Sequence, residues 1–299
     1  MPLQLVTFTD AQGPRPGAMA GADAVLDLLA AGALPAGVRD MQGIIESGPA
    51  ALGAIRAALK APPAAALRPL SSVVLLAPIP RPRRNVFCVG RNYMEHVAEG
   101  DRVAGRQTET PKYPQFFTKA PETVIGPGAA IPDHGATGVT KFLDYEAELA
   151  LIIGRAGVNI PRERALDHVF GWTIGNDVTG RDLQRRHGQW WKGKSLDRSC
   201  PLGPWIVPAD ELDASDLAIE LWVNGEKRQS SRTSKMIFDV REIIHQISLG
   251  FTLLPGDVIL TGTPEGVGYA MDPPRVLKDG DVVEIAIEGI GRLTNPVKA

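Results

Sequence analysis

The chain has 299 residues, and its 32 Lys and Arg against 34 Asp and Glu give a formal net charge of −2 at pH 7. This balance argues against a protein that binds nucleic acid or an anionic membrane surface, because both need a basic patch. Its two cysteines exclude a disulfide framework and a thiolate-rich zinc site, and they favour a reducing compartment. Hydrophobic residues make up 44% of the chain, which is enough for a sizeable core.

The first ten residues lack the basic start and apolar run of a signal peptide. The longest uncharged apolar stretches are too short or too polar for a membrane helix, which needs about 20 residues. We therefore expect a cytoplasmic protein without a membrane segment.

Residues 1–77 are predicted to form a small α+β domain. The expected elements are a strand at 3–9, a turn region at 17–22, a strand end or short helix at 24–30, and a helix at 44–60. Alternating prolines at 78–82 fix φ and withhold N–H donors, so this segment favours an extended linker.

Residues 83–299 are predicted to form a second, larger domain. Short β-type runs recur at 85–89, 115–118, 147–153, 172–174, 217–223, 258–261 and 282–287, with helical patterns at 162–168, 178–186 and 240–246. The Asn-Gly pair at 224–225 is typical of a hairpin turn. Many strands and few helices predict a β-dominated α+β fold, a sandwich or roll, in place of a doubly wound sheet.

Acidic residues alternate along the segment 144–148. As a strand, this segment places Asp144, Glu146 and Glu148 on one face. Both faces become apolar after Glu148, so its carboxylate is costly to bury unless it is paired or bound to metal. Oxygen ligands without a Cys/His cluster favour a hard ion, Mg²⁺ or else Mn²⁺ or Ca²⁺. The alternative is an exposed acidic strand face.

A third carboxylate, Asp177, follows the short strand predicted at 172–174. An acid at a strand end is well placed to complete a triad with Glu146 and Glu148. Arg181, just beyond, is suited to fork onto a substrate carboxylate. The alternative role of Asp177 and the preceding Asn is to cap a helix or an Asx-turn.

Two further segments carry candidate chemistry. Lys194 lies among aromatic and glycine residues and is either a partner for an anion or metal-site carboxylate, or an ordinary surface lysine. In a helical turn, His96 and Glu99 share one face, so the carboxylate can hold one imidazole nitrogen and leave the other free as a general base. The alternative for this pair is a surface contact. The polar segment 99–111 is a candidate mobile lid.

Together these segments resemble the fumarylacetoacetate hydrolase family from about residue 85 to the C-terminus. The matching stretches are residues 88–93 with His96 and Glu99, then 114–119, 144–148, 176–184, 193–195, 200–205, 223–225 and 260–268. The N-terminal region resembles the short extra domain of the longer bacterial members. Gly180 stands where the motif more often has Ala.

The resemblance implies a mixed β-sandwich roll, usually in a homodimer, with the active site in the larger domain. It implies metal ligands at Glu146, Glu148 and Asp177, a catalytic lysine at Lys194, and a catalytic lid dyad at His96 and Glu99. The substrate-binding residues that it implies are Arg91, Arg181, Gln184 and Thr263.

We therefore expect a metal-dependent hydrolase that cleaves a C–C bond in a small acylpyruvate or 1,3-diketo acid, of the fumarylacetoacetate or fumarylpyruvate type met in aromatic catabolism. In this hypothesis His96, oriented by Glu99, activates water. The alternative is an isomerase or decarboxylase of hydroxymuconate- or oxaloacetate-type acids at the same metal-enolate site. A non-catalytic small-molecule binder is the third hypothesis.

Overall fold

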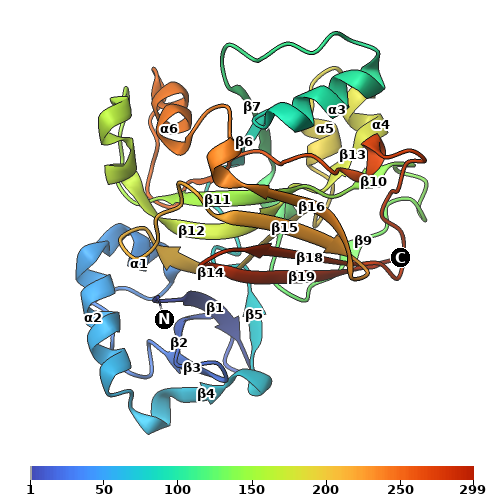
Figure 1. The fold of residues 1–299 in the computed structure, drawn as a ribbon. Helices are drawn as coiled ribbons and strands as arrows, with labels where there is room; N and C mark the ends of the chain where they lie inside the picture. Colours follow the sequence, from blue (N-terminus) through green and yellow to red (C-terminus); the bar gives the residue numbers. More distant parts are fainter. Residues whose placement is uncertain (1) are drawn as a thin grey trace.

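The computed structural model describes residues 2–299; Met1, the first residue of the expected N-terminal domain, lies outside the described residues. The N-terminal part is drawn in blue to cyan in Figure 1 and carries five strands and two α-helices. These are β1 (Leu5–Thr9), β2 (Arg15–Met19), β3 (Ala24–Asp27), α1 (Met41–Ser47), α2 (Pro49–Lys60), β4 (Leu67–Pro69) and β5 (Val74–Leu76).

Two expectations for this part are wrong in part. The turn region expected at 17–22 is right only for residues 20–22, which connect β2 to β3, because residues 17–19 belong to strand β2. Gly17 permits close packing there, since a Cβ would lie 2.6 Å from Val25 Cγ1. The helix expected at 44–60 is two helices, because Gly48 adopts a φ of +53° and caps α1. Pro49 then begins α2, since proline suits the first helical position and cannot continue a helix.

The larger part is β-rich. Its first half contains β6 (Val86–Gly90), α3 (Met94–Ala104), β7 (Gln115–Lys119), β8 (Val124–Ile125), β9 (Ile131–Pro132), β10 (Leu143–Asp144), β11 (Ala147–Ile153), β12 (Val169–Asn176) and β13 (Thr179–Gly180). Its second half contains α4 (Arg181–Arg186), α5 (Trp191–Lys194), β14 (Cys200–Pro208), β15 (Ala218–Val223), β16 (Glu226–Arg232), α6 (Val240–Ser248), β17 (Val258–Leu260), β18 (Val282–Ile287) and β19 (Gly291–Lys298).

Every β-run predicted in the larger part overlaps a strand, and the helix predicted at 240–246 is α6. The hairpin turn is also confirmed, because Asn224 and Gly225 both have positive φ and connect β15 to β16. The helix expected at 162–168 is instead a 3₁₀ segment. The helix expected at 178–186 begins only at Arg181, because Thr179–Gly180 pairs with β10.

The fold is a β-dominated α+β fold with mixed sheets, as predicted. One twelve-stranded sheet contains the path β4-β3-β2-β1-β14-β12-β11-β17-β6-β7, and a five-stranded sheet has the order β16-β15-β18-β19-β9. Most neighbours are antiparallel, whereas β17–β6, β14–β8 and β19–β9 are parallel. The side chains between the two sheets form the main apolar core, to which Leu149, Ile219 and Ile285 contribute.

The two parts of the chain share a sheet. Strand β1 pairs with β14, where Leu5 lies opposite Ile206, and a second apolar core contains buried residues from both parts. The division into residues 1–77 and 83–299 remains a proposal.

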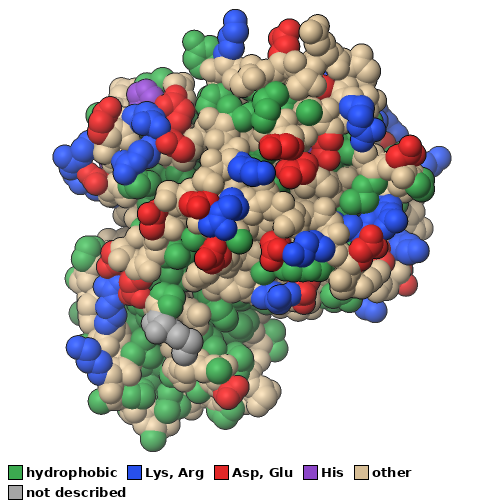
Figure 2. All heavy atoms as spheres, in the orientation of Figure 1, with side chains coloured by type: hydrophobic (Ala, Val, Ile, Leu, Met, Phe, Trp, Pro, Cys, Tyr) green, Lys and Arg blue, Asp and Glu red, His purple; other side chains and the backbone are tan. Residues whose placement is uncertain are grey.

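The outer surface carries charges of both signs. Figure 2 shows Lys, Arg, Asp and Glu side chains interspersed over the larger part, and more apolar side chains on the N-terminal part. Among residues 2–299, no helix has the length and apolar character needed to cross a membrane.

Candidate active site

Pairing of β11 with β12 brings the predicted metal ligands together. Ala147 lies opposite Asn176, so Glu146 and Glu148, on either side of Ala147, come close to Asp177. The backbone N–H of Asp177 donates to the carbonyl of Glu146 at 3.0 Å, which fixes the end of β12 beside the start of β11.

The continuous strand expected over residues 144–148 is wrong. Strand β10 ends at Asp144 and β11 begins at Ala147, because the N–H of Glu146 donates to the Asn176 side chain at 3.0 Å. Asp144 therefore belongs to a different part of the site, where its carboxylate accepts the N–H of Gly268 at 2.8 Å.

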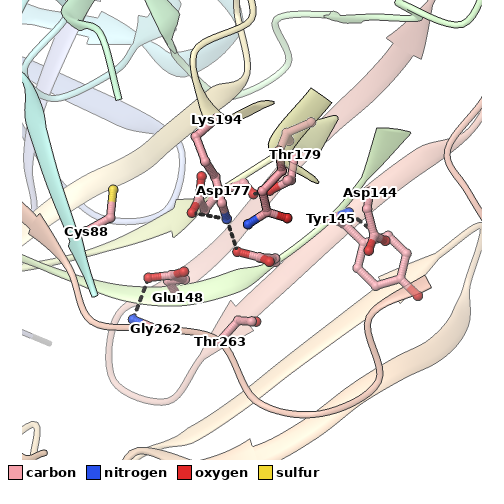
Figure 3. Close-up of polar contacts among 12 residues, drawn as sticks. Cys88, Asp144, Tyr145, Glu148, Asp177, Thr179, Lys194, Gly262 and Thr263 are labelled. Carbon is pink, nitrogen blue, oxygen red and sulfur yellow. Dashed lines mark hydrogen bonds and ion pairs between the residues drawn. The ribbon is translucent and has the colours of Figure 1, made fainter. Parts of the chain in front are cut away.

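The three carboxylates form a buried cluster. Glu146, Glu148 and Asp177 each offer one oxygen, and these three oxygens all lie within 4.8 Å of one another. Oδ1 of Asp177 is buried and accepts no well-directed hydrogen bond from residues 2–299, although Lys119 Nζ lies 2.8 Å away. This set of hard oxygen donors fits a divalent metal ion. Figure 3 shows Glu148 and Asp177 facing the same space, with Lys194 reaching towards Asp177.

Positive charge at the cluster is unevenly distributed. Lys194 Nζ lies 2.7 Å from Glu146 Oε2 and 2.5 Å from Asp177 Oδ2, whereas no lysine or arginine of the described chain pairs with Glu148. Burial, and then repulsion from Asp177 and Glu146, raise the pKa of Glu148 well above its ordinary value. Burial alone would also raise the pKa of Glu146, but Lys194 and Arg181 hold it well below that value. A cation on the Glu148 side would relieve this imbalance.

Lys194 is not the surface lysine of the alternative interpretation. Its side chain is 2% exposed, and although burial opposes the charged form, Asp177 and Glu146 raise the pKa of Lys194. The residue therefore keeps its charge and orients both carboxylates.

A second buried lysine escaped the sequence analysis. Lys119, at the end of β7, is fully buried and pairs with Asp177, while donating to the carbonyls of Val178 and Lys194. Lys119 lies in the stretch 114–119 that resembles the family, but nothing in the local sequence pattern distinguishes a buried lysine from a solvated lysine at a strand end.

The charge of Arg181 is directed at protein carboxylates. Its Nε lies 2.9 Å from Asp144 Oδ2 and its Nη1 lies 2.6 Å from Glu146 Oε1, while its guanidinium stacks 4.3 Å from the ring centroid of Tyr269. The residue lines the cleft, as expected for a substrate-binding position, but its strongest contacts hold Asp144 and Glu146 in place.

The predicted dyad lies on helix α3. His96 Nδ1 is 2.8 Å from Glu99 Oε1, and the second oxygen of Glu99 accepts the N–H of Gly266 at 3.0 Å. No hydrogen bond joins His96 Nε2 to any of residues 2–299, so this nitrogen is available to a ligand. The carboxylate thus orients the imidazole in the way that a general base requires.

One cleft of about 640 Å³ unites these groups. His96, Glu146, Glu148 and Lys194 line it. The predicted substrate-binding residues Arg91, Arg181, Gln184 and Thr263 line it as well. Glu99 and Asp177 are absent from the cleft surface; Glu99 contacts His96, and Asp177 belongs to the carboxylate cluster.

Comparison with known proteins agrees with this geometry. The family model described as the fumarylacetoacetate hydrolase C-terminal domain matches residues 85–298. This chain belongs to the fumarylacetoacetate hydrolase family. The match covers all of the carboxylate cluster and the dyad, and it begins three residues after the proline-rich linker.

Individual members of the fumarylacetoacetate hydrolase family resemble the chain closely. Oxaloacetate tautomerase YisK of Bacillus subtilis is 48% identical over 76% of this chain and 74% of its own length. A solved fumarylacetoacetate hydrolase from Exiguobacterium antarcticum has 42% identity and a TM-score of 0.83, covering 99% of both chains. The 5-carboxymethyl-2-hydroxymuconate delta-isomerase of Mycobacterium smegmatis has 36% identity and a TM-score of 0.74, also over 99% of both. The relatives are thus enzymes with different named reactions.

Proposed function

We propose that this protein is a divalent-metal-dependent enzyme that interconverts the keto and enol forms of a small 2-oxo dicarboxylic acid of the oxaloacetate type. The observation that carries the proposal is the position of His96, which is held by Glu99 and lines the same cleft as Glu146 and Glu148. Keto–enol interconversion needs a base near the carbon next to a polarised carbonyl; His96 is the candidate base, and a metal ion held by the carboxylate cluster would polarise the carbonyl. The proposal groups the protein with its relatives that are named tautomerases and isomerases. It thus favours the isomerase hypothesis of the sequence analysis over the expected hydrolase.

Glu146, Glu148 and Asp177 would hold the metal, with Mg²⁺ the first choice and Mn²⁺ or Ca²⁺ as alternatives. When bound, a divalent ion supplies Lewis-acid polarisation of the substrate's 2-oxo group. Lys194 and Arg181 maintain the orientation of Glu146 and offset its charge.

The dyad transfers the proton. His96 Nε2 removes a proton from the carbon next to the 2-oxo group, and the imidazolium then delivers that proton to the enolate oxygen, which forms the enol and restores the neutral imidazole. Glu99 accepts the hydrogen bond from His96 Nδ1 and stabilises the positive charge that the imidazole gains. A positioned base of this kind contributes about 10²–10⁴-fold to the rate.

C–C bond hydrolysis of an acylpyruvate is the second candidate. The same imidazole can deprotonate water in place of carbon, and the relative from Exiguobacterium antarcticum is named a fumarylacetoacetate hydrolase. The choice between the two depends on whether the cleft admits water beside the bound acid. We keep the expected homodimer as part of this proposal, to be checked by analytical ultracentrifugation.

A two-substrate assay tests the proposal. Purified protein with saturating MgCl₂ is mixed with oxaloacetate, and the ultraviolet absorbance of the enol is followed against a protein-free blank. A parallel reaction contains acetylpyruvate, and pyruvate release is measured with lactate dehydrogenase. We expect faster enol–keto equilibration of oxaloacetate and loss of that acceleration in EDTA. Rapid pyruvate release from acetylpyruvate without tautomerase activity would establish the hydrolase instead.

A further inference from the structure

Helix α4 presents three polar side chains to the cleft. Arg181, Gln184 and Arg185 stand at positions i, i+3 and i+4, so they share one helix face, and all three line the cleft. Arg186, the next residue along, is exposed and does not line it. The sequence patterns predict a substrate-facing role for Arg181 and Gln184 but give no such signal for Arg185.

Arg185 differs from the other cations of the cleft. Arg91 and Arg106 pair with Asp101, while Arg181 and Lys194 pair with the buried carboxylates. Within the described chain, Arg185 alone among the lysines and arginines of the cleft has no carboxylate at ion-pair distance. Its guanidinium therefore remains available to an anion that enters the cleft.

Tyr269 holds Arg185 in place at the cleft. The guanidinium carbon of Arg185 lies 5.3 Å from the centroid of the Tyr269 ring, on which Arg181 also stacks. Stacking of this kind restricts the guanidinium without using its hydrogen-bond donors. Arg185 is exposed whereas Arg181 is buried, so the two mark the outer and inner ends of one face.

We infer that Arg185 binds the distal carboxylate of a dicarboxylate ligand and thereby selects dicarboxylic over monocarboxylic acids. The inference rests on the proposed function, which places the 2-oxo acid end of the ligand at the buried carboxylate cluster. The distal end of such an acid then points to the exposed half of the cleft, where the planar donors of Arg185 match a carboxylate. This contact is open to solvent, so salt weakens it.

The test uses two ligands that the enzyme does not turn over by keto–enol chemistry. L-Malate and L-2-hydroxybutyrate share the 2-hydroxy acid end, and a methyl group in the second replaces the distal carboxylate of the first. Their dissociation constants are measured by calorimetry on the Mg²⁺-loaded protein. The variants are Arg185→Gln, Arg185→Lys as the conservative change, and Arg186→Gln as the matched control.

We expect the wild type to bind malate about tenfold more tightly than 2-hydroxybutyrate. Arg185→Gln should bring this ratio close to one by weakening malate alone, Arg185→Lys should keep part of it, and Arg186→Gln should keep all of it. The inference is overturned if the wild type binds the two acids equally well, or if Arg185→Gln keeps the wild-type ratio of the two dissociation constants. It is also overturned if Arg186→Gln reduces this ratio as much as Arg185→Gln does. Because neither ligand reports tautomerase activity, failure of the proposed function would appear separately in the oxaloacetate assay.

Discussion

Arg91 and Asp101 form a bidentate ion pair in which Nη1 lies 2.9 Å from Oδ1 and Nη2 lies 2.8 Å from Oδ2. Arg91 directly follows strand β6, and its backbone adopts a φ of +57°, whereas Asp101 belongs to helix α3. The side chain of Asp101 is only 3% exposed. The pair therefore fastens the helix that carries the dyad to the end of a core strand, and Arg91 has a structural partner in addition to any ligand.

Asp101→Asn should impair catalysis through the position of α3. Loss of the charged hydrogen bonds should lower the free energy of unfolding by about 2 kcal/mol. We expect kcat to fall about tenfold because His96 is held less firmly, while calorimetric Mg²⁺ affinity stays unchanged. Glu95→Gln, an exposed change on the same helix, is the control. Wild-type kcat in Asp101→Asn would contradict this role.

The same pair gives a pH-dependent contribution to stability. The hydrogen bonds from Arg91 lower the pKa of Asp101, so its stabilising effect is complete above the unfolded-state pKa of about 3.9. That effect is lost as the pH falls through the lower, folded-state pKa. In urea titrations, the difference in unfolding free energy between wild type and Asp101→Asn should thus be constant above about pH 5 and shrink in stronger acid. If this difference grew on acidification, the pKa of Asp101 would be raised by folding and not lowered.

The dyad is tested by removing each member. His96→Gln should lower kcat for oxaloacetate tautomerisation by about 10³-fold. Glu99→Gln should lower it about tenfold, because its one amide oxygen can still accept from the imidazole while the charge of the carboxylate and the acceptor for the N–H of Gly266 are lost. Both variants should bind Mg²⁺ like wild type, since neither residue belongs to the carboxylate cluster. A His96→Gln enzyme with full activity would exclude this histidine as the base.

Gly193 permits the close approach of α5 to α4. A Cβ at this position would lie 2.6 Å from the carbonyl oxygen of Gly180 and closer still to the N–H of Gln184. Gly193→Ala should therefore displace the neighbouring Lys194 and lower the Tm by several degrees. The matched control is Gly53→Ala in helix α2, where a Cβ meets nothing within 4 Å and the free energy of unfolding should rise by up to about 1 kcal/mol. Equal Tm values for both variants would refute the packing argument.

Most strands and the individual acids of the carboxylate cluster are predictable from the sequence because they follow local patterns, whereas the pairing of β11 with β12 brings those acids together. Alternation and apolar runs identify β11, and the acid after β12 follows a recognisable strand end. Long-range contacts account for much of what was missed. The break before β11 depends on the side chain of Asn176, thirty residues away, which takes a hydrogen bond from Glu146.

The roles of the cations were the least predictable part of the site. Arg91 and Arg181 were expected to face substrate, but their main contacts are with Asp101 and Asp144. The burial of Lys119 and the stacking of Arg185 on Tyr269 arise only when distant segments pack together. A long cationic side chain has the same local signature whether it is solvated, buried or aimed at a ligand.

Calorimetric titration of Mg²⁺ into wild type and Glu148→Gln tests the central claim most directly. The buried carboxylate of Glu148 has no cationic partner within residues 2–299. We propose that a metal ion held by the carboxylate cluster is that partner. We predict one Mg²⁺ per chain in the wild type, no measurable binding in Glu148→Gln, and wild-type binding in the exposed control Glu122→Gln. Circular dichroism should show Glu148→Gln folded, since its neutral side chain removes a repulsive charge. Mg²⁺ binding by Glu148→Gln with wild-type affinity would contradict the account.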